Sequence, residues 1–281
     1  MSNPYLARFN GVFSGAAPVI GMVHMYALPG APGFSGDLND VIDRAVRDAT
    51  SLAEGGVDAL LVENFHDYPF YPITTEPETV AAAAVVAREV ARHTDLPLGI
   101  NILRNSWKAS LGIAAAVDAQ FIRLNILTDA AVTDQGIINS EAHLVARYKK
   151  HIGGEHILTL ADLLTKHARP LVDRPVGVIA EDMLHRGGAD AIILAGDNTA
   201  MPPSLDRLRQ VKDAIPDAPV ILGSGMTAAH AVSYAEVADG AVFGYGSKPG
   251  HDMDLPASTD LAREFVGLWR SGQATKDANA A

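Results

Sequence analysis

The stretch LAEGGVDALLVEN (residues 52–64) contains, in order, the end of a helix, a Gly-Gly turn and a short strand that is apolar on both faces. The stretch LHRGGADAIILAG (residues 184–196) has the same order. A strand with two apolar faces is typical of a parallel sheet covered by helices. The similarity fits a fold with two similar halves, although any short helix-to-strand loop also favours Gly and Asp at these positions.

Short apolar runs recur along the chain, and each is followed by a polar loop and a segment with helical periodicity. We predict eight strands, at residues 18–23, 59–63, 97–101, 121–125, 156–160, 191–195, 219–223 and 240–244. We predict helices at residues 37–52, 77–93, 107–117, 141–150, 176–186, 204–214, 227–237 and 260–270. Eight alternating strands and helices predict an α/β protein with a single (β/α)8 barrel, the TIM-barrel fold.

One domain accounts for the length and composition of the chain. Its 281 residues, of which 48% are hydrophobic, are enough for one large core, and barrels of this class typically contain ~250 residues. We expect the barrel to span residues 18–270, after an N-terminal extension (1–17) and before a flexible, polar tail (271–281).

Charge and composition argue against several classes of partner. The formal net charge is -11 and no basic run exceeds Lys149-Lys150, so we expect no nucleic-acid partner. The absence of cysteine excludes disulfides and a cysteine nucleophile. No apolar run approaches the ~20 residues of a membrane span, and the N-terminus does not resemble a signal peptide. We therefore expect a cytoplasmic protein without a transmembrane segment, and a homo-oligomer, as is common for soluble proteins.

The residues that end the predicted strands are the candidates for a site, because such barrels carry their active sites at the C-terminal strand ends. Three carboxylates, Glu63, Asp162 and Asp197, end strands and are candidates for a general acid or base. Asp162 could equally cap the following helix. We favour Glu63 as the base or as a clamp for the substrate.

Other polar residues end neighbouring strands. His24 is a candidate for proton transfer or for holding a hydroxyl or phosphate oxygen, although it could simply bond a nearby loop. Arg123 and Asn125 lie on the same side of their strand; Arg123 is expected to pair with a carboxylate inside the barrel, or alternatively to clamp an anion. The residues expected to bind substrate are Asn64, Asn101, Arg123 and Asn125.

Glycine-rich segments end the last two strands, VILGSGMT (220–227) and VFGYGSKPG (242–250). Glycine lets the backbone approach a ligand, a helix that begins near Thr227 directs its positive end there, and barrels bind phosphate at this place. The alternative is that these glycines only form tight turns. The residues expected to bind phosphate are Gly196, Gly223, Ser224, Gly225, Gly244, Gly246, Ser247 and Lys248.

Some chemistries have little support. A Schiff-base aldolase needs a lysine inside the barrel, and no predicted strand contains one; Lys248 better suits phosphate or loop contacts. Glu63, His66 and Asp67 could bind a divalent metal, but their spacing is not diagnostic. We expect no obligatory metal and no cofactor.

Motifs along nearly the whole chain, from about Pro18 to Trp269, resemble the BtpA/SgcQ family: PVIGMVHMYALPGAPGFSG (18–36), GGVDALLVENFHDYPF (55–70), LGINILRN (98–105), FIRLN (121–125), ADAIILAGDNT, PVILGSGMT and ADGAVFGYGSK. The resemblance implies a TIM barrel of the ribulose-phosphate-binding type, with associations to photosystem I biogenesis and to carbohydrate operons. It matches the family motifs at His24, at Glu63-Asn64 and at Gly223-Ser224-Gly225. The chain departs from the family pattern after strand six and in the closing GYGSKPGHDMD, which could change contacts at the rim of the site.

Two functions from different classes follow. The first is an enzyme that acts on a small phosphorylated sugar or nucleoside-derived metabolite, by proton abstraction next to a carbonyl or by carbon–carbon or glycosidic bond cleavage. The second is a non-catalytic biogenesis or assembly factor, of the photosystem I type, that uses the barrel as a docking module. A metal-dependent hydrolase is a third interpretation, without a visible ligand motif.

Overall fold

Eight parallel strands form a closed barrel, so the predicted (β/α)8 fold is confirmed. The computed structural model describes residues 4–13, 17–196 and 200–280. Around the barrel the strands are β1 (Val19–His24), β2 (Ala59–Glu63), β3 (Leu98–Asn101), β4 (Phe121–Leu124), β7 (Leu158–Leu163), β9 (Ala191–Leu194), β10 (Val220–Leu222) and β11 (Ala241–Phe243). Pairing of β11 with β1 closes the ring.

Helices cover the outside of the barrel and lie close to their predicted positions. They are α2 (Leu38–Glu54), α3 (Pro77–Arg92), α4 (Trp107–Val117), α5 (Ala142–His151), α6 (Val176–His185), α7 (Leu205–Ala214), α8 (Ala228–Ala235) and α9 (Thr259–Ala280). Helix α2 begins where the Asp37 carboxylate accepts a hydrogen bond from the Asn39 N–H, which satisfies a donor at the helix start. It ends at a Gly-Gly turn in which Gly56 has a positive φ of 90°.

The inside of the barrel is filled by apolar side chains that alternate along the strands with those facing the helices. This inner cluster contains Ile20, Met22, Ala59, Leu61, Phe121, Leu158, Leu160, Ala191, Ile193, Ile221 and Val242. Phe121 occupies so much of the interior that a Cβ at Gly99 would lie 2.1 Å from its ring. A side chain at residue 99 would therefore conflict with Phe121.

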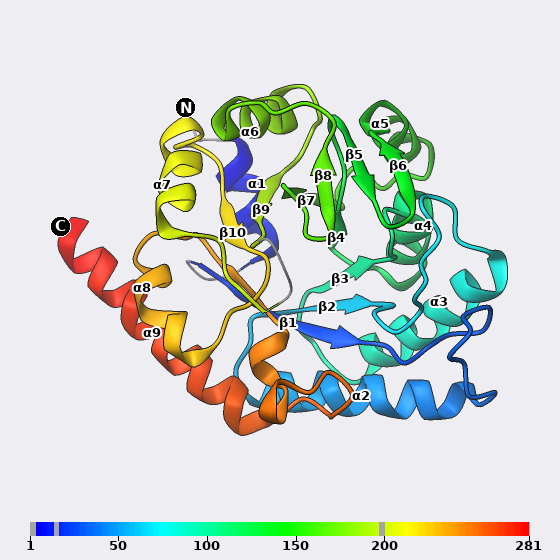
Figure 1. Cartoon of the computed structure of the whole chain (residues 1–281). Coiled ribbons are helices and arrows are strands. Elements are labelled where there is room, and N and C mark those ends of the chain that lie inside the picture. Colours follow the sequence, from blue (N-terminus) through cyan, green and yellow to red (C-terminus); the bar gives the residue numbers. More distant parts are fainter. Residues whose placement is uncertain (1–3, 14–16, 197–199, 281) are drawn as a thin grey trace.

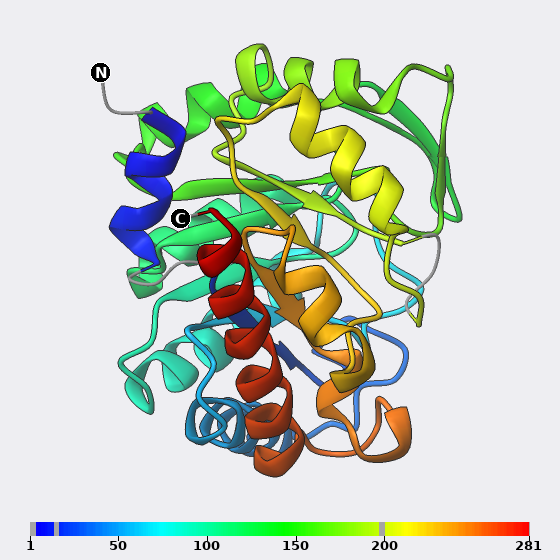
Figure 2. The same cartoon turned by 90° about the vertical axis from the view of Figure 1, so that its left-hand side faces the viewer.

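An N-terminal helix, α1 (Pro4–Val12), closes one end of the barrel (Figure 2). The segment was expected only as an extension, yet the rings of Phe9 and Phe13 belong to the inner cluster. The Phe13 ring lies 5.3 Å from that of Phe121. Arg8 on the same helix forms a 2.8 Å ion pair with Asp190, just before β9.

A second, small sheet lies at the opposite end, in the loops that follow β4 and β7. It consists of β5 (Ala130–Thr133), β6 (Gly136–Asn139) and β8 (Ala168–Pro170) in the order β6-β5-β8 (Figure 1). This sheet was not among the predicted strands. The hairpin turns at Gly136, where φ is 95°, and its inner face packs Ala131 and Ile138 against Ile126.

The C-terminal end differs from the expected flexible tail. Residues from Ser271 continue α9 as helix to Ala280. The Gln273 side chain donates a hydrogen bond to the carbonyl of Ala235, and Lys276 Nζ donates one to the carbonyl of Ala238 at 3.2 Å. These contacts attach the last turns of α9 to α8 and the loop after it.

A buried ion pair joins the end of the chain to its beginning. Lys248 lies between the short 3-10 helices η1 (Tyr245–Ser247) and η2 (Pro249–His251), and its Nζ is 2.6 Å from Asp48 Oδ2 on α2. Both side chains are fully buried. The other oxygen of Asp48 accepts a hydrogen bond from the Ala257 N–H at 2.8 Å. The loop after β11 is therefore fixed to the first helix that follows a barrel strand.

Within the described residues, no helix combines the length and the apolar character needed to cross a membrane.

The packing of α1 predicts that it is part of the core. We expect Phe13→Ala to lower the free energy of unfolding by about 3–5 kcal/mol, because it leaves a cavity beside Phe121. Leu6→Ala, on the exposed side of the same helix, is the matched control, with an expected loss of about 0.5 kcal/mol or less. Urea unfolding measures both. Equal losses for the two variants would show that α1 does not contribute to the barrel core.

Candidate active site

A ring of polar side chains lies directly above the apolar inner cluster. Every second residue of a barrel strand points inside. On each strand, the residue two positions after the last inward residue of the filled interior therefore also points inside. On the first five strands these positions are polar: His24, Glu63, Asn101, Arg123 and Asp162. On the last three they are small: Ala195, Gly223 and Gly244. The mouth is therefore polar on one side and built of small residues on the other.

Strand register brings three of these residues together. His24 is the Cα partner of Glu63, and Glu63 is the partner of Asn101. All three are buried. The Asn101 amide donates a hydrogen bond to Glu63 Oε2, and no described group bonds Glu63 Oε1. The carboxylate is thus held through one oxygen and lines the cavity at the mouth.

Arg123 pairs with Asp162, as the ion-pair interpretation predicted. Its Nε and Nη2 donate to the two carboxylate oxygens at 2.9 and 3.1 Å, and its Nη1 lies 3.8 Å from Glu63 Oε2. Burial alone would lower the pKa of Arg123, but Asp162 and Glu63 more than offset it and raise this pKa. Asn125 Nδ2 and the Thr165 hydroxyl also donate to Asp162 Oδ2, at 2.8 and 3.1 Å. Asp162 therefore lies inside a hydrogen-bonded network, with no helix-capping bond.

The His24 imidazole is neutral at pH 7. Burial is the main cause that lowers its pKa well below the ordinary value, and the positive charges of Lys248 and Lys166 add to it. Its Nδ1 is buried without a hydrogen-bond partner in the described part of the chain. Residue 244 must be glycine to leave room for the ring, because a Cβ there would lie 2.9 Å from His24 Cε1.

Lys166 is a mouth residue that the sequence analysis missed. Strand β7 begins and ends later than predicted, at Leu158 and Leu163, so its C-terminal end lies closer to Lys166 than expected. Lys166 is half-buried and lines the mouth cavity together with Glu63 and Arg123. Burial, followed by the charge of Arg123, lowers the pKa of Lys166 to about 8. Lys166 follows the strand-end residue Asp162 by four positions in the sequence, and this short spacing was the signal that could have identified it.

The glycine-rich ends of β10 and β11 also line this cavity, through Gly223, Ser224, Gly225 and Gly244. The cavity volume is only about 20 Å³, roughly the room for one water. Part of the glycine pattern serves packing: Gly225 has a φ of 70° and a Cβ there would lie 2.3 Å from the backbone of Met201. The Ser224 hydroxyl accepts a hydrogen bond from the Gly196 N–H at 3.3 Å.

Several expected phosphate ligands point elsewhere. Lys248 is paired with Asp48 outside the mouth, because a buried ammonium requires a counter-charge. The Ser247 hydroxyl donates to the carbonyl of Gly244 at 2.7 Å, and a Cβ at Gly246 would lie 2.5 Å from the carbonyl oxygen of Met226. These three residues support the loop and do not line the cavity.

Asn64 also has a structural role in place of the expected substrate contact. Its Oδ1 accepts from the Leu103 N–H at 2.7 Å, and its Nδ2 donates to Asp67 at 2.8 Å. Asp67 in turn accepts from the Leu28 N–H. Asn64 therefore ties together the loops after β1, β2 and β3. Asp197, a candidate catalytic residue, lies outside the described residues.

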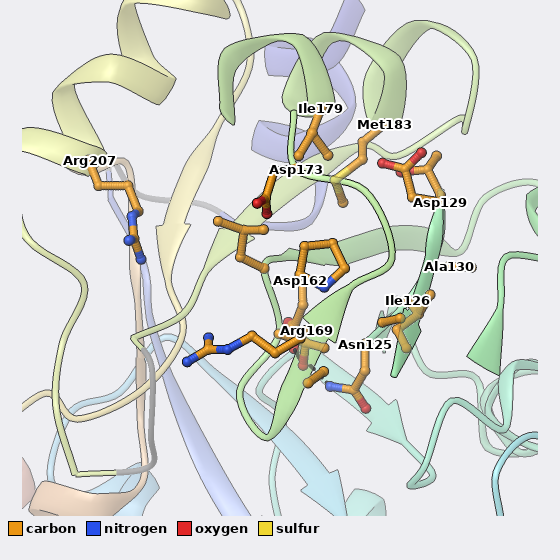
Figure 3. A pocket seen from close by; sticks show the side chains of 16 residues that line it. Asn125, Ile126, Asp129, Ala130, Asp162, Arg169, Asp173, Ile179, Met183 and Arg207 are labelled. Carbon is orange, nitrogen blue, oxygen red and sulfur yellow. Dashed lines mark hydrogen bonds between the residues drawn. The ribbon is translucent and has the colours of Figure 1, made fainter. Parts of the chain in front are cut away.

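A larger pocket opens beside the mouth, on the far side of Asp162 (Figure 3). Its volume is about 440 Å³, and Asn125 and Asp162 form its inner wall. Figure 3 shows Ile179 and Met183 of α6 on the opposite wall. No group of three or more His, Asp or Glu side chains within residues 4–13, 17–196 and 200–280 is placed to hold a metal ion.

Comparison with known proteins agrees with this architecture. N-(5′-phosphoribosyl)anthranilate isomerase from Pyrococcus furiosus superposes with a TM-score of 0.55 over 90% of this chain and 99% of its own, at 14% identity. Similarity at this level shows the shared fold.

Relatives by sequence are much more similar. An uncharacterized protein of Pyrococcus abyssi is 40% identical over 258 residues, which cover 90% of this chain and 98% of that protein. The photosystem I biogenesis protein BtpA of Synechocystis sp. is 43% identical over 208 residues, or 74% of this chain and 72% of that protein. The sequence profile of the BtpA family matches residues 16–268. The chain therefore belongs to the BtpA family.

Proposed function

We propose that this chain is an enzyme that carries out acid–base chemistry on a small phosphorylated sugar or nucleoside-derived metabolite at the mouth of the barrel. The observation that supports this most is the Glu63 carboxylate, which Asn101 holds through one oxygen beside the neutral imidazole of His24. Burying such a group costs stability unless it is paired. A barrel that served only as a scaffold would have no need for this arrangement.

The proposed chemistry assigns a role to each group. Glu63, as carboxylate, takes a proton from the carbon next to a substrate carbonyl. His24, which is neutral, gives a hydrogen bond to the carbonyl oxygen as negative charge develops there, and a lowered pKa favours this role. Arg123 and Lys166 supply positive charge at the same cavity. The Arg123–Asp162 pair keeps the guanidinium in place during this step.

The substrate phosphate is proposed to bind on the side of the mouth built of small residues. Gly223, Ser224 and Gly225 line that side, with Lys166 as the nearby cation. The name of one structural neighbour includes a phosphoribosyl compound, but the proposal rests on the mouth residues. Because the cavity holds only about 20 Å³, entry of a phosphosugar requires side chains such as Phe65 or Met253, which also line it, to move.

A second candidate function is a docking factor for assembly, since a relative at 43% identity is named a photosystem I biogenesis protein. One structural observation favours it. Val132 and Ile137 are cross-strand neighbours on β5 and β6, and they expose 46% and 59% of their surface. Leu171 and Val172, which follow β8, are also exposed. Exposed apolar groups of this kind are common at interfaces between proteins.

Thermal unfolding with a ligand panel tests the proposal. The panel contains sugar 5-phosphates, the same sugars without phosphate, and inorganic phosphate. A ligand at ~100 times its Kd stabilises the fold by ~2.7 kcal/mol, so we expect a rise in Tm with a phosphorylated sugar and none with its unphosphorylated form. Lys166→Met should remove the rise. No shift with any phosphorylated compound would favour the docking function instead.

The lowered pKa of Lys166 predicts a pH dependence of phosphate binding. The ammonium is charged below a pKa of about 8 and loses its charge as the pH rises through this value, while a phosphate monoester stays a dianion above ~7. Affinity for the phosphorylated ligand should therefore fall above about pH 8. Lys166→Arg should remove this fall, because a guanidinium remains charged. Identical pH profiles by calorimetry for wild type and variant would show that Lys166 does not contact the phosphate.

Glu63→Gln tests the catalytic role. Glutamine still accepts the Asn101 hydrogen bond through its carbonyl oxygen but cannot take a proton, so we expect turnover of a ligand found in the panel to fall about 10²–10⁴-fold. The Tm rise with that ligand should persist. Glu89→Gln, at a half-buried position on α3 outside the mouth, is the control. Unchanged turnover in Glu63→Gln would rule out Glu63 as the base.

A further inference from the structure

The pocket beside Asp162 contains the room that the barrel mouth lacks. Its volume is about 440 Å³, against about 20 Å³ at the mouth, and small-molecule sites commonly measure ~300–1,000 Å³. Asn125 and Asp162 separate the two spaces, and Asp162 is bonded both to Arg123 of the mouth and to Asn125 of the pocket wall. A ligand that filled the pocket would therefore lie directly beside the proposed site.

Part of the described lining of the pocket is apolar. Ile126, Ile179 and Met183 are buried side chains that line it, and the ring of Pro170 adds a further apolar surface. Figure 3 shows Ile179 and Met183 opposite Asn125 and Asp162, with the space between them. Methionine and aliphatic groups make favourable contacts with a flat ring. The apolar lining suits a planar group.

The inner wall also holds a buried acceptor without a partner. Asn125 Nδ2 donates to Asp162, but Asn125 Oδ1 is buried and has no hydrogen-bond partner among the described groups. Buried polar atoms are normally paired. Figure 3 shows this oxygen directed away from Ile179 and Met183, so an occupant of the pocket does not reach it in this structure.

The rim of the pocket offers both kinds of hydrogen-bonding group. Arg169 on β8 is exposed there and supplies donors, and its planar guanidinium can also stack on a ring. Asp173 is exposed on the same rim and supplies acceptors. Asp129, by contrast, is occupied by a 3.0 Å ion pair with Arg174.

We propose that this pocket is a second subsite that binds the heterocyclic base of a nucleoside-derived phosphate, while the phosphate binds at the barrel mouth. A nucleobase has two apolar faces and an edge with both donors and acceptors, which matches the apolar walls and the polar groups of Arg169 and Asp173 that also line the pocket. The proposal rests on the function proposed above and names its substrate class, a nucleoside-derived phosphate whose sugar part carries the carbonyl that the step at Glu63 requires. The junction between sugar and base would lie beside Asp162.

Calorimetric titration with three kinds of probe tests this subsite: ribose 5-phosphate, a set of purine and pyrimidine nucleosides, and their 5′-monophosphates. We expect a 5′-monophosphate to bind roughly tenfold or more tightly than ribose 5-phosphate, because the base buries apolar surface in the pocket. Ala168→Phe, which places a ring at the partly exposed lining residue Ala168, should remove this gain and leave ribose 5-phosphate binding unchanged. Arg169→Ala, which removes the exposed guanidinium that lines the pocket, is a second variant and should weaken binding of the 5′-monophosphates but not of ribose 5-phosphate. Circular dichroism checks that both variants fold.

The outcomes separate the two proposals. If ribose 5-phosphate and every 5′-monophosphate bind equally, or if Ala168→Phe weakens both by the same factor, the second subsite is wrong and the proposed phosphate site stands. If nucleosides bind and Ala168→Phe abolishes their binding while added phosphate brings no gain, the base subsite stands and the phosphate mouth is wrong. Absence of binding by all three kinds of probe overturns both.

Discussion

The buried guanidinium of Arg123 is the group on which the organisation of the barrel mouth depends. A charge in this position is tolerated only because Asp162 accepts two of its hydrogen bonds and Glu63 lies 3.8 Å away. The three residues come from β4, β7 and β2, so the pairing fixes the upper edge of the barrel across several strands. Asn101 and Asn125 complete the network by donating to the two carboxylates. The proposed base is thus oriented by the Asn101 hydrogen bond and lies within the same network that neutralises Arg123.

The change from an apolar to a polar interior occurs within one step of the strand alternation. Leu61 and Leu160 belong to the filled interior, and the next inward residues, Glu63 and Asp162, belong to the polar ring. The apolar layers stabilise the fold and exclude water from below the site. They also lower the local dielectric, which strengthens the interactions among the charges above them. The lower residues of each strand therefore stabilise the fold, and the residues at its C-terminal end form the proposed site.

Much of this could be predicted from the sequence, and the failures have physical reasons. The strands were found because residues such as those of ALLVE are apolar on both faces, and His24, Glu63 and Arg123 became candidates because they lie at or near the C-terminal strand ends. Local pattern gave no information on contacts between distant segments, so Lys248 was assigned to phosphate although its partner is Asp48 on α2. Lys166 was missed because β7 extends to Leu163, beyond its predicted end. The turn at Gly136 was a readable hairpin signal between the two short apolar runs of β5 and β6.

The ion pair between Lys248 and Asp48 joins residues that are 200 positions apart. During synthesis, Asp48 and its ion-pair partner Arg44 on the same helix leave the ribosome long before Lys248 and Ala257, the distant partners of the Asp48 carboxylate. The pairing of β1 with β11 is equally distant in the chain, and contacts of such high sequence separation form late and slowly. Until then the Asp48 carboxylate has only Arg44 of its own helix as a partner among these three contacts, and the barrel lacks the pairing of its first and last strands. It can close only after its last strand and the following loop have been translated.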